Sequence, residues 1–263
     1  MSSATVVAGE ADPDLRVAKL RRFNLYMGSL HLAQAVAMLA LSNSFALPVT
    51  SSYLRYDSAT EKLLPDPTTL FSVRIGPMVA AFLLLSSIAH FLLASPGING
   101  WYVRNIRRGM NPARWMEYAL SSSLMIVVIA LITGLYDIAA LILIFALNAT
   151  MILFGWMMEL HNQSTDKTNW TAYWFGCFAG LIPWIAIGLY LFGSTPGPPD
   201  FVYWIYGSMF LFFNIFAVNM ILQYKKVGRW ADYLYGERAY IILSLVAKSL
   251  LAWQVFAGTL RPA

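Results

Sequence analysis

Long apolar runs separated by short polar segments dominate the chain. Each run is close to the roughly 20 residues that cross a bilayer as a helix, and the breaks carry turn-forming residues such as Ser95-Pro96-Gly97. We predict seven membrane-spanning helices, at residues 24–47, 73–94, 113–135, 137–160, 171–193, 201–223 and 237–259. The expected fold is an all-α, seven-helix transmembrane bundle in a single domain, residues 1–263, that begins with a polar tail at residues 1–15.

One connection, residues 48–72, is much longer than the others. Tyr53, Arg55 and Asp57 alternate in it with Leu54 and Tyr56. A period of two is typical of a β-strand, so we predict a short β-hairpin in this segment. An irregular loop fits the same residues almost as well.

The composition supports a membrane protein with several spans. The chain is 59% hydrophobic and 12% charged, whereas an ordinary soluble domain carries about 25% charged residues. Its formal net charge of +5 does not indicate nucleic acid, because the basic residues cluster in short loops beside apolar runs. The single cysteine, Cys177, excludes an intramolecular disulfide.

The distribution of basic residues predicts the orientation. Thirteen of the 18 Lys and Arg residues fall on the side of the N-terminus, four fall on the opposite side, and Lys248 lies within a span. Positive charge is retained in the cytoplasm. We therefore expect a multi-pass protein of the cell membrane with a cytoplasmic N-terminus and an extracellular C-terminus, and with residues 48–72 outside.

Two charged residues lie deep in apolar runs. Lys248 is the only basic residue between Ala239 and Gly258, and Glu117 lies about five residues into the third span. A charge at the centre of a membrane helix costs about 2.5–3.5 kcal/mol on insertion scales. The two spans run in the same direction, and a helical side chain leans toward the N-terminus of its helix. Lys248 can therefore reach toward Glu117, either as a functional site or as a structural ion pair.

Further polar side chains follow helical spacing near these two. Ser244 precedes Lys248 by four residues, and Ser86 and His90 form another pair four residues apart. Asn24 and His31 share a stripe on the first span. Such groups are expected to face the bundle interior, although serines in membrane helices commonly serve close packing.

Other polar and aromatic residues have simpler interpretations. Glu159 lies near a span end and is expected to reach water, His161 is expected to be interfacial, and Asp137 is expected to cap a helix. The phenylalanines within residues 201–223 fit either packing or the wall of an apolar ligand slot. We predict no metal site.

Seven spans with a mid-membrane lysine on the seventh and one carboxylate on the third resemble the microbial rhodopsins. The inverted orientation, the long outer loop, "EYALSSS" in the third span and "SLVAK" in the seventh together resemble the heliorhodopsins. The resemblance implies that all-trans retinal is bound to Lys248 as a protonated Schiff base with Glu117 as counterion. It also implies that Ser244 lies near the Schiff base, that Ser86 supports the counterion, and that His31 and His90 belong to a hydrated, proton-accepting cavity.

The same resemblance implies a chromophore wall that begins on the third span. The residues expected there are Tyr118, Ser121, Ser122, Met125, Asn148, Ile152, Phe212 and Phe216.

The expected function is light sensing without ion transport or enzymatic activity. A pump needs titratable groups on both sides of the Schiff base, and the outer half of the spans offers no deep carboxylate. The resemblance implies a closed photocycle, an unidentified signalling partner and a homodimer. A light-driven transporter or channel, and a non-retinal carrier with a structural Lys–Glu pair, remain as alternatives.

Overall fold

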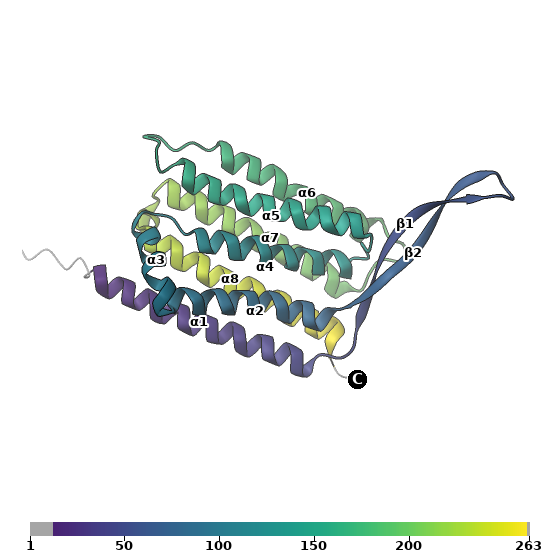
Figure 1. Ribbon diagram of the computed structural model, residues 1–263, viewed down its shortest axis with the longest axis horizontal. Coiled ribbons are helices and arrows are strands. Elements are labelled where there is room, and N and C mark those ends of the chain that lie inside the picture. The colour runs from purple at the N-terminus through teal and green to yellow at the C-terminus, as the bar shows by residue number, and fades with distance from the viewer. Residues whose placement is uncertain (1–12, 262–263) are drawn as a thin grey trace, which may run out of the picture.

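The computed structural model describes residues 13–261, and most of them belong to helices that lie side by side in a bundle (Figure 1). The longer helices have 20 to 29 residues. Their bounds are α1 (Pro13–Leu41), α2 (Ile75–Ala94), α4 (Pro112–Ile132), α5 (Ile138–His161), α6 (Thr171–Gly193), α7 (Asp200–Tyr224) and α8 (Tyr233–Val255). A 3-10 turn, η1 (Gly228–Ala231), precedes α8, and a π-helical turn, η2 (Phe256–Leu260), continues it.

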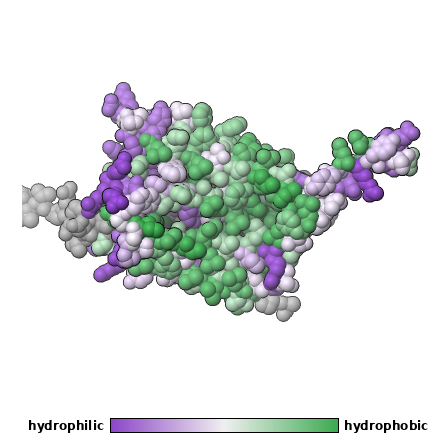
Figure 2. Space-filling model, viewed as in Figure 1, coloured by the Kyte–Doolittle hydropathy of each residue, from purple (hydrophilic) through white to green (hydrophobic). Residues whose placement is uncertain are grey.

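Six of these helices are long and apolar enough to cross a membrane. They are α2, α4, α5, α6, α7 and α8 together with η2. The first helix is longer than the others, at 29 residues, but the charged residues of its first turns and the polar residues Asn24, His31 and Gln34 lower its mean hydropathy. The space-filling view shows a broad apolar band around the bundle, with hydrophilic residues gathered mainly beyond its two ends (Figure 2). This surface is that of a membrane protein.

The first helix differs most from its predicted span of residues 24–47. It begins at Pro13, so residues 13–15 of the predicted tail are helical, and it ends at Leu41. The tail's residues 1–12 lie outside the described part. Asn43 explains the early end, since its side-chain oxygen accepts a hydrogen bond from the Phe45 N–H at 2.8 Å and its amide donates to the Thr259 carbonyl at 2.9 Å. Such local bonds compete with helix continuation.

A short helix that we did not predict, α3 (Pro96–Arg107), crosses one end of the bundle (Figure 1). The sequence of this segment indicates only a turn followed by a basic loop. Pro96 occupies the first helical turn, a position that proline favours. The chain thus continues past the break after α2 as a second helix and reaches α4 through residues 108–111.

The long connection forms a β-hairpin that projects from the opposite end (Figure 1). Strand β1 (Ala46–Asp57) pairs antiparallel with β2 (Lys62–Arg74), with Tyr53 opposite Asp66 and a bulge between Val49 and Thr50. The predicted hairpin is confirmed, and it is longer than expected. At its tip the Asp57 carboxylate accepts a hydrogen bond from the Thr60 hydroxyl at 2.6 Å, which lowers the pKa of Asp57.

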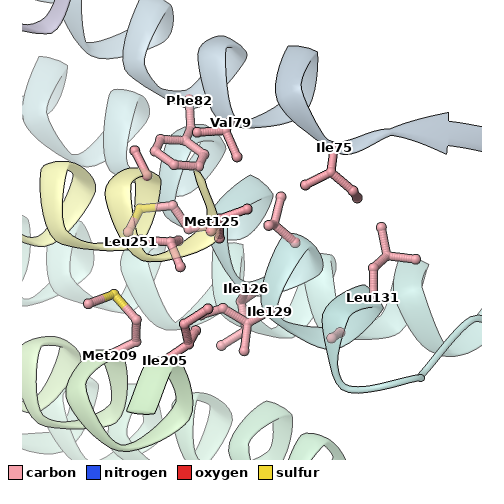
Figure 3. Packing of buried hydrophobic residues seen from close by; sticks show 14 of the residues in the cluster. Ile75, Val79, Phe82, Met125, Ile126, Ile129, Leu131, Ile205, Met209 and Leu251 are labelled. Carbon is pink, nitrogen blue, oxygen red and sulfur yellow. The ribbon is translucent and has the colours of Figure 1, made fainter. Parts of the chain in front are cut away.

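The main apolar core lies in the half of the bundle nearer the hairpin, where α2, α4, α7 and α8 meet (Figure 3). Phe82, Ile129 and Leu251 from three of these helices have no exposed surface. Within the bundle, α1 packs against α2, α2 against α4, α4 against α5, α5 against α6, and α7 against α8. Between α6 and α7 the contact is made by aromatic rings, with Trp184 edge-on to Tyr206, Phe210 and Phe213.

Candidate functional site

Lys248 and Glu117 form a buried ion pair between α8 and α4. Lys248 Nζ lies 3.2 Å from Glu117 Oε1, and the two side chains are 4% and 10% exposed. Each charge therefore has the partner that its burial requires. The pairing expected from the lean of the lysine side chain is present in the structure.

Two serines complete the polar shell of this pair. The Lys248 ammonium donates to Ser244 Oγ at 2.7 Å, one turn earlier on the same helix. The Ser86 hydroxyl donates to Glu117 Oε1, also at 2.7 Å, from α2. Both serines are buried. The amine and the carboxylate are thus each held by a second hydrogen bond besides their mutual contact.

Tyr118 lies directly beneath the lysine. Lys248 Nζ sits 5.0 Å from the centroid of the Tyr118 ring, within the range of a cation–π contact. The Tyr118 hydroxyl donates to the Tyr240 carbonyl at 2.8 Å and so ties α4 to α8 a second time. The ring of Tyr118 also contacts Phe216 edge-on.

An apolar cavity of about 320 Å³ extends from Tyr118 toward α5, α6 and α7. This volume falls at the small end of ligand pockets, about 300–1,000 Å³. Gly180 leaves space for the Met151 side chain in the cavity wall, because a Cβ at residue 180 would lie 2.2 Å from Met151 Sδ. Besides Tyr118, the lining includes Trp115, Met151, Ile152, Tyr173, Cys177, Trp184, Phe210, Phe213, Asn214, Phe216, Met220 and Tyr240.

Polar residues gather on the other side of Glu117. His90 Nδ1 and Asn24 Oδ1 are 2.7 Å apart, and the His31 and His90 rings stack with centroids 5.7 Å apart. A second cavity of about 30 Å³, lined by Glu117, Ser86, His90 and Asn24, continues toward the end of the bundle that carries α3. His31 is fully buried, and neither of its ring nitrogens has a partner.

A second buried ion cluster closes that end. Arg114 on α4 pairs with Glu159 on α5 at 2.5 Å and with Glu237 on α8. Asn111 donates to Glu237 at 2.5 Å through its side chain and to Glu159 at 2.9 Å through its backbone N–H, and all four residues are buried. Arg114 is therefore a clamp between three helices.

The cluster corrects the interpretation of Glu159, which we expected to reach water. Its side chain is 2% exposed because it is packed against Arg114 and accepts a hydrogen bond from the Trp115 indole at 2.7 Å. The sequence alone singles out neither Glu237 nor Arg114, which is one of the thirteen basic residues on the side of the N-terminus. The signal available was three charged residues at matching depths near span ends on the same side.

The remaining predicted positions are more scattered. Asn148 donates to Ser122 Oγ at 2.8 Å, between α5 and α4. Ser121 is fully buried with no hydrogen-bond partner. Met125 and Phe212 pack with the apolar core. Phe213, which follows Phe212, packs against this core too and also lines the 320 Å³ cavity.

A helical membrane bundle with a buried lysine–carboxylate pair beside an apolar cavity is the arrangement of a rhodopsin-like protein. The model of the heliorhodopsin family matches residues 20–260. The chain therefore belongs to the heliorhodopsin family, which implies a light-sensing photoreceptor that binds retinal. No curated protein matches the chain.

The residues present fit retinal. An aldehyde requires an amine, and Lys248 provides one that is buried and held between Ser244 and Glu117. A polyene requires an apolar slot, and the 320 Å³ cavity begins at Tyr118, whose ring lies under the lysine. Ser121 lies on α4, the helix of Tyr118, and its buried hydroxyl has no hydrogen-bond partner.

We predict that Arg114→Gln destabilises the bundle strongly. The substitution leaves Glu159 and Glu237 buried without a cation, and breaking a buried pair in this way costs about 3–5 kcal/mol. Thermal unfolding in detergent should show a clear drop in Tm. Arg229→Gln, which removes an exposed charge at the same end, is the control and should change Tm little. Equal stability of the two variants would contradict the clamp.

Proposed function

We propose that this protein is a seven-span light sensor in which Lys248 carries all-trans retinal and Glu117 is its counterion. The observation that carries the proposal is the buried contact between Lys248 Nζ and Glu117 Oε1 at 3.2 Å. Bound retinal supplies visible absorption and a light-driven isomerisation. The protein residues hold the positive charge at Nζ and keep water from it.

The polar groups divide this work among them. Glu117 neutralises the charge at Nζ, Ser86 orients the Glu117 carboxylate, and Ser244 accepts a hydrogen bond from Nζ. Tyr118, Ile152 and Phe216 line the apolar cavity. Phe213 joins the proposed wall because it too lines this cavity.

The predicted orientation belongs to the proposal. An odd number of spans carries the two termini to opposite sides, and the described chain begins and ends at opposite ends of the bundle (Figure 1). The exposed basic residues of α3 gather at the end where α1 begins. We therefore propose that α1 also spans the membrane, which brings the number of spans to seven. The N-terminus is then cytoplasmic, the hairpin is extracellular, and the protein lies in the cell membrane.

We propose a closed photocycle without ion transport. His31, His90 and Asn24 offer a place for a proton on one side of Glu117. Besides Glu117, the buried carboxylates among the described residues are Glu159 and Glu237, and both lie on that same side. A proton that leaves Lys248 toward these groups can therefore return to Lys248 from the same side, without crossing the membrane.

Transport is the alternative that a current would establish. Sustained photocurrent or net pH change in illuminated proteoliposomes would favour a pump or channel over the sensor. The signalling partner is proposed only as a class, a membrane or cytoplasmic protein. No enzymatic step is assigned to any residue.

A homodimer is the proposed assembly. The hairpin extends beyond the bundle and exposes Tyr53, Leu54, Tyr56 and Leu63, each more than half exposed. These apolar side chains fit contact with a second copy. Cross-linking in native membranes measures the assembly, and recovery of monomer alone would contradict it.

We predict that Lys248→Ala abolishes the visible absorption band after expression with retinal. The substitution removes the amine to which retinal would be attached. The matched control is Lys225→Ala, an exposed lysine, which should keep the band. A band that survives Lys248→Ala would overturn the assignment of the site.

We predict that Glu117→Gln shifts the visible band to longer wavelength. A negative partner stabilises the protonated form at Nζ, so its loss should also lower the pH at which the band disappears on alkaline titration. Glu61→Gln, in the exposed tip of the hairpin, should change neither property. An unchanged spectrum and titration in Glu117→Gln would point to a different counterion.

A further inference from the structure

Helix α3 is held at the membrane surface by its two connections. Ser95 alone separates it from the span α2, and residues 108–111 alone separate it from the span α4. Four residues reach at most about 14 Å when fully extended. The helix therefore stays at the depth of the lipid headgroups.

The inner face of α3 is fixed against the bundle. Ile98, Tyr102 and Ile106 follow each other at four-residue intervals and pack with Leu20 of α1 and Ile241 of α8. Tyr102 is 1% exposed and Ile106 is 5% exposed. The apolar stripe of this amphipathic helix is thus covered by protein and not by lipid chains.

The exposed side of α3 and of the residue that ends it carries an aromatic ring and two cations. Trp101 and Arg104 lie on α3, outside the buried stripe, and Arg108 directly follows the helix as its C-cap. All three are exposed, and Trp101 is 38% exposed. The Arg104 side chain lies along the helix near Gly100.

The beginning of α1 carries further positive charge at the same end of the bundle. Lys19 and Arg22 flank the buried Leu20 and are exposed. Arg16 differs from them, because it forms an ion pair with Asp232. These exposed side chains at one end of the bundle, Trp101, Arg104, Arg108, Lys19 and Arg22, which we call the basic rim, combine cations with an interfacial aromatic residue.

We propose that the basic rim binds the headgroup of an anionic phospholipid in the adjoining leaflet. Arg side chains bind phosphate oxygens through paired N–H donors, and tryptophan favours the depth of the headgroups. A lipid is favoured over a soluble acidic partner because α3 cannot leave the membrane surface. The proposal depends on membrane insertion of the bundle and not on retinal at Lys248.

Native mass spectrometry of the purified full-length protein tests this site. Phosphatidylglycerol and phosphatidylcholine with the same acyl chains are added in turn to the protein in detergent. We expect phosphatidylglycerol adducts to form preferentially. In Arg104→Gln/Arg108→Gln this preference should fall about 5- to 30-fold, because the variant loses the electrostatic attraction of one or two basic residues to the anionic headgroup.

The control is Lys225→Gln/Lys226→Gln, which removes the same number of exposed charges at the loop after α7. It should retain the preference. Equal loss in both double variants would show a general effect of charge and overturn the site, as would equal binding of the two lipids.

A second measurement uses the unmodified protein. Phosphatidylglycerol binding should weaken as salt is raised, because the contacts are ionic. Binding that does not respond to salt would contradict a headgroup site and indicate acyl-chain contacts elsewhere. Because colourless protein serves equally well, this result is independent of the visible-band experiment on Lys248.

Discussion

The fold depends on neutralising charge away from water. Lys248 and Glu117 join α8 to α4 near the middle of the bundle, and Arg114 joins α4 to α5 and α8 nearer its end. A buried charge without its partner is costly, so each pair fixes how these helices sit against one another. Helix α4 takes part in both pairs and is therefore the element against which the others are placed.

The two ion clusters differ in their number of carboxylates. Lys248 meets one carboxylate, Glu117, whereas Arg114 meets two, Glu159 and Glu237. The 30 Å³ cavity is lined by Glu117 and also by Arg114, so both ion clusters border the same small open space. The Arg114 cluster holds the N-terminal end of α8 through Glu237, and Asn43 holds the opposite end through the Thr259 carbonyl of η2 at 2.9 Å.

Much of this could be predicted from the sequence, for reasons that particular residues show. The bounds of α6, residues 171–193, were predicted to the residue, because polar segments flank a continuous apolar run. The pairing of Lys248 with Glu117 followed from the cost of burying either alone. The Arg114 cluster could not be found in this way, since its members lie near span ends where water is an equally good partner. The length of the hairpin was missed because, beyond the buried Val49, both of its faces are mostly exposed, so no strong alternation of apolar and polar residues marks the strands.

The hairpin has a consequence for how copies of the chain can associate. A two-stranded ribbon has two free edges, each able to pair with a further strand. Pro65 and Pro67 stand two apart in β2, so both would present their nitrogen to the same edge. Proline has no N–H to donate, and since the inner edge is paired with β1, the missing donors lie on the outer one. Strand addition at the outer edge of β2 is thus discouraged, so association through the hairpin is left to the outer edge of β1 and to the side chains on the faces of the hairpin.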